Sequence, residues 1–166
     1  MVQEILTISS LETGGADIAG ECFNCIQIIK SYLGETQDLI AKKDLQIHLD
    51  VPPSVLISGN KILLEKVFSN LIGNAIKYSP QGAIICISIF REQERTGFSI
   101  ENTGVHIPEE SIPKLFDAFY RVDQSRSRTT GGSGLGLYIV QEILRQHKSE
   151  CKVINTQSGV KFSFFI

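Results

Sequence analysis

The stretch from Asn60 to Ser79 constrains the fold most, because it has the pattern of one long amphipathic helix. Its apolar residues recur at helical spacing; they are Leu63, Leu64, Val67, Leu71 and Ala75. Asn60 can cap the helix through its side-chain oxygen, and Pro80 ends it. A helix with one such apolar face must bury that face against other elements, so it predicts a layered domain.

A polar, cationic stripe lies on the other side of this helix. Asn70, Asn74, Lys77 and Tyr78 follow one another at i, i+4, i+7 and i+8, so they project from one side. Amide oxygens suit Mg²⁺, an ammonium suits a phosphate, and an aromatic ring can lie beside a base. The alternative is a surface helix whose asparagines merely face water.

Helical and strand patterns alternate along the rest of the chain. Helices are expected over Met1–Glu12, Ile18–Lys42, Pro108–Phe116 and Leu135–Gln146, and strands over Leu45–Val51, Val55–Ser58, Ala83–Phe90, Phe98–Glu101, Cys151–Thr156 and Val160–Ile166. Thr96 and Gly97 are expected to close a hairpin. These patterns predict an α+β fold: a two-layer α/β sandwich with a mixed, largely antiparallel sheet covered on one face by helices.

Composition narrows the class of protein. A chain of 166 residues is most simply one domain, and a net charge of −2 gives no basic footprint for nucleic acid. No apolar run is long enough to cross a bilayer and no signal peptide is evident, so we expect a cytoplasmic chain without direct membrane contact. Cys22 and Cys25 form a CxxC pair without a second pair, which favours reduced thiols over a metal or redox site.

A glycine-rich run from Gly131 to Leu137, GGSGLGL, opens the last predicted helix. Backbone amides in such a run can point together at an anion, and the positive end of the helix dipole lies beside them. A phosphate is therefore the expected ligand. No GK[ST] follows and no strand precedes it, which excludes a Walker loop and a dinucleotide fingerprint. Taken alone, the glycines are weak evidence for a phosphate site, because glycines also serve plain turns.

Three stretches together, NLIGNAIKYS, IENTGVHIPEE and FDAFYR with GGSGLGL, resemble the ATP-binding domain of bacterial sensor histidine kinases of the GHKL superfamily. Their order matches the N box, first glycine box, F box and second glycine box of that family, and the details are most like vancomycin-resistance sensor kinases. The resemblance covers Ile18 to Ile166 and implies the Bergerat ATP-binding fold. It also implies binding of ATP with Mg²⁺ and donation of the γ-phosphoryl group to a histidine on a separate dimerisation domain, for relay to a response regulator.

The resemblance assigns roles along the motifs. Asn74 would hold Mg²⁺, Asn70 would line the same wall, Lys77 would meet a phosphate, and Tyr78 would border the nucleoside. The remaining residues expected to contact the nucleotide are Asn102, Gly104, Ile107, Arg121, Gly132, Gly134, Leu135 and Gly136. The polar segment from Ser125 to Thr130 would be a lid, and Phe116 and Phe119 would serve either this lid or the core.

Two positions depart from the family pattern. Asn102 stands where an aspartate usually accepts a hydrogen bond from the adenine amino group; an amide oxygen can accept the same bond without the charge. His106 stands where the family has its second glycine, so its side chain is expected to narrow the pocket or to contact the nucleotide.

The phosphoacceptor motif of the family is absent, and none of His48, His106 and His147 has its setting. We therefore expect residues 1–15 to be a stub of the preceding dimerisation helix and residues 16–166 to be the ATP-binding domain. The chain is expected to be the cytoplasmic portion of a membrane-anchored sensor kinase. A GHKL-type hydrolase is one competitor, although Asn70 occupies the place of its catalytic glutamate. A nucleotide-sensing module without catalysis is the other.

Overall fold

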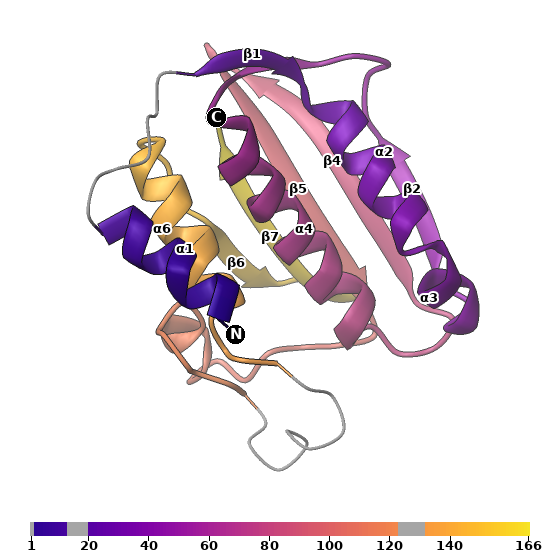
Figure 1. The fold of residues 1–166 in the computed structure, drawn as a ribbon. Coiled ribbons are helices and arrows are strands. Elements are labelled where there is room, and N and C mark those ends of the chain that lie inside the picture. Colours follow the sequence, from indigo (N-terminus) through magenta and orange to yellow (C-terminus); the bar gives the residue numbers. More distant parts are fainter. Residues whose placement is uncertain (1, 13–19, 123–131) are drawn as a thin grey trace.

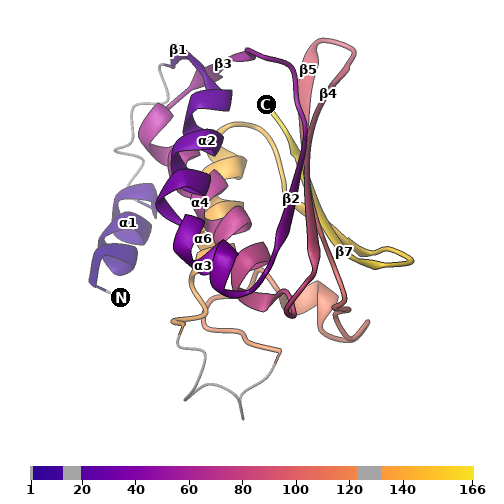
Figure 2. The same cartoon turned by 90° about the vertical axis from the view of Figure 1, so that its right-hand side faces the viewer.

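The computed structural model describes residues 2–12, 20–122 and 132–166. A five-stranded sheet runs in the order β2 (Gln46–Asp50), β4 (Ile84–Glu92), β5 (Arg95–Thr103), β7 (Gly159–Phe165) and β6 (Lys152–Asn155). Only the β2–β4 pair is parallel; the other neighbours are antiparallel. Figures 1 and 2 show α2 (Cys25–Glu35), α3 (Gln37–Lys42), α4 (Lys61–Tyr78) and α6 (Gly136–Gln146) on one face of this sheet. The predicted two-layer α/β arrangement is confirmed.

Helix α4 is the centre of the helical layer. The Asn60 side chain accepts a hydrogen bond from the Leu63 amide at 3.0 Å and so caps the helix as predicted. Phe68 on the buried face of α4 packs on Phe98 of β5 and Phe164 of β7, with ring centroids 5.2 Å and 5.7 Å away. This aromatic cluster fixes α4 over the middle strands, and α4's polar stripe then lies at the edge of the core.

The expected single helix over Ile18–Lys42 is wrong. Within its described part, residues 21–24 form strand β1 (Glu21–Asn24), which pairs antiparallel with β3 (Leu56–Gly59) in a separate two-stranded sheet. Helix α2 begins only after Asn24, whose side-chain oxygen accepts from the Ile26 and Val55 amides at 3.1 Å each. A second break comes at Thr36, whose hydroxyl donates to the Tyr32 carbonyl at 2.8 Å and separates α2 from α3.

Two further expectations need correction. Thr96 and Gly97 lie inside β5; the hairpin turns earlier, at Gln93, which has a φ of 54°. This strand position holds a glycine because the Phe90 ring lies across it, and a Cβ there would come within 2.3 Å of that ring. The stretch from Pro108 to Phe116 forms turns with a short 3₁₀ helix, η1 (Ile112–Lys114), because Pro113 inside it has no backbone N–H to donate.

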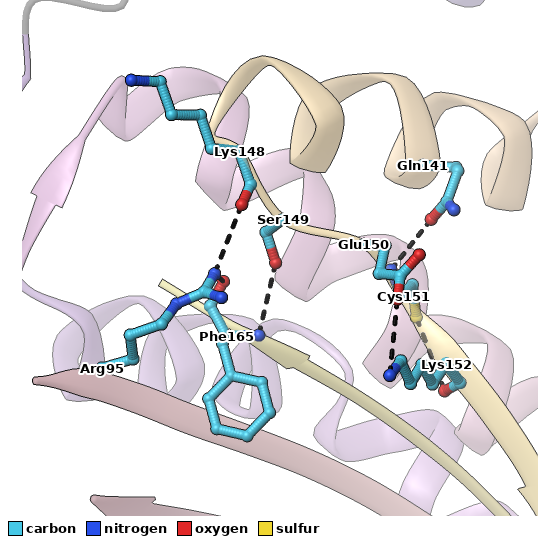
Figure 3. A network of polar contacts seen from close by, with 8 residues as sticks. All are labelled: Arg95, Gln141, Lys148, Ser149, Glu150, Cys151, Lys152 and Phe165. Atoms are coloured by element: carbon cyan, nitrogen blue, oxygen red, sulfur yellow. Dashed lines mark hydrogen bonds and ion pairs between the residues drawn. The ribbon is translucent and has the colours of Figure 1, made fainter. Parts of the chain in front are cut away.

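The connection from α6 to β6 is tied to the end of the sheet (Figure 3). The Arg95 guanidinium donates to the carbonyl of Phe165 at 3.2 Å, and the Phe165 amide donates to the Ser149 hydroxyl at 3.4 Å. Gln141 of α6 accepts from the Cys151 amide at 2.9 Å. These bonds fix the connection between α6 and β6 to the middle of α6 and to the end of β7.

Helix α1 (Val2–Glu12) lies outside the main helical layer, beside α6 (Figures 1 and 2). Leu11 is buried, and Gln146 of α6 donates to the Leu11 carbonyl at 3.0 Å. Lys66 of α4 donates to the Thr7 hydroxyl at 3.3 Å. The outer side of α1 leaves Val2, Ile5 and Leu6 exposed; they are 73%, 50% and 63% accessible. None of the helices in the described ranges is long and apolar enough to span a bilayer.

All four cysteines are free thiols in this structure. Burial raises the pKa of the Cys25 thiol to about 11 and that of Cys151 to about 12, against the lowering effect of a backbone hydrogen bond at each. Cys22, on β1, is exposed. No group of three or more potential metal ligands of the His, Cys, Asp or Glu type occurs within residues 2–12, 20–122 and 132–166.

Candidate functional site

A cavity of about 470 Å³ lies among the second half of α4, the loop that follows β5, and the start of α6. Ten of the twelve predicted nucleotide contacts line it: Asn70, Asn74, Lys77, Tyr78, Asn102, Ile107, Arg121, Gly132, Gly134 and Gly136. The other two do not. Gly104 forms the turn after β5 with a φ of 79°, and the Leu135 side chain is fully buried in the core.

Asn102 lies at the buried end of the cavity, where it is 3% exposed. Its amide nitrogen donates to the Ser79 hydroxyl oxygen at 3.2 Å, and that hydroxyl donates to the Ala75 carbonyl at 2.6 Å. Since the Ser79 proton is committed to Ala75, the Ser79 oxygen can only accept, and the nitrogen of Asn102 must face it. The amide oxygen of Asn102 is therefore left as an acceptor at a site that lines the cavity.

The two asparagines of α4 have different surroundings. The Asn70 nitrogen donates to the Lys66 carbonyl at 2.8 Å, and its oxygen lies against Gly136, where a Cβ would approach it to 2.6 Å. Only a glycine at the start of α6 allows this approach. Asn74, one turn later, is half-buried, and its side-chain amide forms no hydrogen bond within the described parts of the chain. Asn74 is thus the asparagine whose oxygen is available to a hard cation.

Cationic side chains gather beside the glycine run. The Lys77 ammonium lies 5.2 Å from the Tyr78 ring centroid, and a Cβ at Gly132 would be 2.9 Å from that ammonium. Arg121 donates to the Gly132 carbonyl at 3.0 Å. Both cations therefore lie next to the same short backbone segment, which provides charge complementary to an anion.

The glycine run turns sharply into α6. Gly134 has a φ of 73°, and its carbonyl accepts from the Phe119 amide at 3.0 Å. The Ser133 hydroxyl accepts from the Leu135 amide at 3.2 Å and donates to the Glu4 carboxylate of α1 at 3.0 Å. The Leu135 amide, expected to face a phosphate, is thus bonded within the loop. The positive end of α6 still lies at this end of the cavity.

His106 lines the cavity, but its ring extends to the turn between β6 and β7. Its Nε2 lies 2.9 Å from the Thr156 carbonyl, which requires a proton on Nε2. Thr156 is not among the residues that line the cavity. The expected narrowing is therefore limited, because the end of the imidazole is bonded to the neighbouring turn.

The two phenylalanines of the predicted F box separate. Phe116 packs partly buried against the core, whereas Phe119 is 67% exposed with a φ of 65°. The role as core filler thus holds for Phe116 and is wrong for Phe119. The predicted lid, Ser125 to Thr130, lies outside the described residues.

Sequence reasoning missed Glu4, Ser79 and Ser133. Ser79 and Ser133 lie inside the recognised motifs NLIGNAIKYS and GGSGLGL, so their polar side chains were a usable signal. Glu4 gave none, because α1 reaches the cavity only through tertiary packing. Of the other histidines, His48 is exposed on β2, and His147 accepts from the Asn60 amide at 3.2 Å while it donates to the Ile143 carbonyl at 2.8 Å.

Comparison with known proteins gives consistent matches. Residues 59–166 match the model of the family described as histidine kinase-, DNA gyrase B- and HSP90-like ATPase. The phosphate regulon sensor protein PhoR of Pseudomonas aeruginosa is 36% identical over 126 residues, which are 76% of the chain and 28% of that protein. The sensor protein VanSB of Enterococcus faecalis is 35% identical over 161 residues, 97% of the chain and 36% of that protein.

Solved structures extend the similarity to the fold. The catalytic domain of histidine kinase ThkA, in a nucleotide-free form, is 25% identical with a TM-score of 0.79; the match covers 89% of the chain and 94% of that domain. The chain spans about a third of the length of the curated relatives it matches.

Proposed function

Because the chain belongs to the family of histidine kinase-, DNA gyrase B- and HSP90-like ATPases, we propose that it is the part of a sensor histidine kinase that binds Mg-ATP and donates its γ-phosphoryl group to a histidine on a separate dimerisation domain. One observation carries the proposal: a fixed amide acceptor at Asn102 and a cationic, glycine-lined end at Lys77 and Gly132 belong to one cavity.

The adenine base binds at the buried end of the cavity, beside Asn102. The Asn102 oxygen accepts a hydrogen bond from the amino group of adenine, because Ser79 holds the amide in that orientation. Guanine has a carbonyl oxygen where adenine has its amino group, so two acceptors would face each other. The site should therefore prefer ATP to GTP.

The phosphates lie toward α6. Lys77 and Arg121 face their negative charge, and the amides of Gly132, Gly134 and Gly136 border the same end of the cavity. The donor set for Mg²⁺ is an uncharged amide, Asn74, with Asn70 on the same wall; an amide oxygen and phosphate oxygens are ligands that Mg²⁺ accepts. When bound, Mg²⁺ would neutralise developing charge on the phosphates.

The acceptor histidine comes from elsewhere in this proposal. His48 lies on β2, His147 is hydrogen-bonded at the end of α6, and the ring of His106 is bonded to Thr156. Residues 1–15 would be the end of the dimerisation helix that precedes the domain, with a response regulator as the downstream partner. The intact protein would be anchored in a membrane with this part in the cytoplasm.

A hydrolase is the second candidate function. It is disfavoured because Asn70 is an uncharged carboxamide, which has no basic group to take a proton from water, and its nitrogen donates to the Lys66 carbonyl. Steady release of phosphate from ATP by the isolated chain, far above background, would favour it.

Calorimetric titration with Mg-ATP and Mg-GTP tests the proposal. We expect ATP to bind more tightly than GTP, and Asn74→Ala to weaken ATP more in the presence of Mg²⁺ than in its absence. Addition of the histidine-bearing dimerisation domain in trans should then yield phosphohistidine on that domain and not on this chain. Absence of binding heat with either nucleotide would contradict the proposal, and binding without transfer would leave only a nucleotide-sensing module.

A further inference from the structure

The loop after β5, residues 104–108, forms one wall of the cavity without a regular structure of its own. We call it the base-side loop. It is tied to the turn between β6 and β7: the Gly104 amide donates to the Ser158 carbonyl at 2.9 Å, and the His106 ring is bonded to the Thr156 carbonyl. The position of this wall therefore depends on residues about fifty positions later in the chain.

Asn155 makes the most specific of these connections. Its oxygen accepts from the Ile107 amide at 2.9 Å, while its nitrogen donates to the Ile107 carbonyl at 2.8 Å. The same nitrogen donates to the Glu109 carboxylate at 3.0 Å. Two oxygen acceptors on one side and an N–H on the other allow only this orientation of the amide. We refer to these bonds as the Asn155 clamp.

Strand register places the clamp in line with the residue that reads the base. Asn155 of β6 pairs with Val160 of β7, and Val160 pairs with Asn102 of β5. Cross-strand partners project from the same face of a sheet, and two strand spacings amount to about 10 Å. Ile107 is thus held from the same row of residues that carries Asn102, with Val160 between them lining the cavity.

We propose that Asn155 is a positioning residue for nucleotide selectivity: it clamps Ile107 so that the base-side loop holds adenine against the Asn102 acceptor. This inference rests on the proposed function. Asn155 itself touches no nucleotide; it acts through the backbone of Ile107. Loss of the clamp leaves Asn102 in place but lets the facing wall move, so that discrimination between bases falls together with affinity.

The test compares Asn155→Ala with Gln157→Ala, which removes an exposed amide side chain two residues away. We expect Asn155→Ala to weaken Mg-ATP binding roughly tenfold. GTP binding should change less, so the ratio of the two affinities falls. Amide hydrogen exchange at Ile107 should accelerate in the nucleotide-free chain, while exchange in α6 and the melting temperature stay close to those of the control.

A second variant covers the case in which Asn155→Ala fails to fold. Asn155→Asp has the same shape and keeps the acceptor for the Ile107 amide, but it sets a second oxygen against the Ile107 carbonyl and the Glu109 carboxylate. Its ATP binding should be weakened, and Glu109→Gln added to it should restore part of the loss, because a glutamine can donate to the new carboxylate.

Wild-type ATP affinity in both Asn155 variants, or an equal loss of ATP and GTP with unchanged exchange at Ile107, would overturn the inference. A wild-type chain that binds neither nucleotide would instead overturn the proposed function. In that event the exchange rate of Ile107 in the free chain still shows whether the clamp holds the loop, so the two failures are distinguishable.

Discussion

At the scale of single residues, the orientation of the Asn102 amide in the cavity is set by two linked hydrogen bonds. Ser79 can donate only once, to Ala75, and this fixes which end of the Asn102 amide faces the cavity. An aspartate at position 102 would place an oxygen against the Ser79 oxygen. The Ser79 hydroxyl would then have to donate to that aspartate and give up its hydrogen bond to the Ala75 carbonyl. Asparagine at position 102 and serine at position 79 therefore form a matched pair.

Replacing Asn102 by leucine should abolish the preference for an amino-bearing base. Leucine keeps the branched shape of the side chain but removes the acceptor, so ATP binding should weaken about tenfold or more. A triphosphate of purine riboside, which lacks the amino group, should bind wild type and variant alike. Calorimetry with both nucleotides measures the difference, and an equal loss for the two would show that the substitution acts by distortion of the cavity.

Glu101, the neighbour of Asn102, should make stability depend on pH on the acid side. Burial alone would raise its pKa, but hydrogen bonds from Thr156 at 2.7 Å and from Lys161, with the Lys161 charge at 3.3 Å, lower the pKa below its ordinary value. A lowered folded pKa gives stability that is present above the ordinary glutamate pKa and is lost as pH falls through the folded value.

Glu101→Gln should therefore cost on the order of 0.5 kcal/mol of unfolding free energy near pH 7, with a cost that shrinks as the pH falls below about 4. Urea unfolding at several pH values measures it. Glu92→Gln, an exposed glutamate on β4, is the matched control and should show no such convergence with wild type. A constant difference between Glu101→Gln and wild type at all pH values would contradict the assignment.

At the scale of elements, the end of α4 is held by a side chain that directly follows another helix. The Lys43 ammonium, just after α3, donates to the carbonyls of Ile76 and Lys77 at 2.8 Å each, and desolvation by burial lowers its pKa. These carbonyls belong to the last turn of α4, where helices lack partners for such groups and favour a cation. The same turn carries the side chains of Lys77 and Tyr78.

Lys43→Met should loosen that turn. We expect a loss of about 1 kcal/mol in unfolding free energy and faster amide exchange near Tyr78, together with weaker nucleotide binding. Lys42→Met provides the control, because Lys42 is exposed at the end of α3 and makes the same change of charge. Equal effects of the two variants would mean that the charge, and not the bonds to α4, is responsible.

The elements differ in how far sequence alone could predict them. The spacing of Asn70, Asn74, Lys77 and Tyr78 was sufficient, because one helix determines their relative positions. Strand β1 was missed because four residues that precede α2 continue its helical pattern, and their partner β3 is more than thirty residues away. Asn155 was missed for the same reason: its partner Ile107 is distant in sequence, and no local period indicates it.

At the scale of the whole molecule, α1 links the outside of the domain to the cavity. Hydrogen bonds join it to the domain: Gln146 donates to the Leu11 carbonyl, Lys66 to the Thr7 hydroxyl, and Ser133 to the Glu4 carboxylate. The third contact places a half-buried carboxylate among the residues that line the cavity, beside the glycine run. An anion in this place repels the phosphates that the glycine run would bind, so docking of α1 and nucleotide binding should oppose each other.

Glu4→Gln should accordingly raise affinity for Mg-ATP several-fold, because it keeps a hydrogen-bond acceptor for Ser133 and removes the negative charge. Glu35→Gln makes the same change of charge at the exposed end of α2 and should leave affinity unaltered. By reciprocity, saturating nucleotide should accelerate amide exchange in α1 of the wild-type chain and do so less in Glu4→Gln. Calorimetry measures the affinity, and hydrogen exchange measures the response of α1 independently. Unchanged affinity in Glu4→Gln together with unchanged exchange in α1 of the wild-type chain would mean that the helix only covers the domain. Higher affinity in Glu4→Gln together with faster exchange in α1 of the nucleotide-bound wild type would mean that the position of α1 controls how tightly the cavity binds nucleotide.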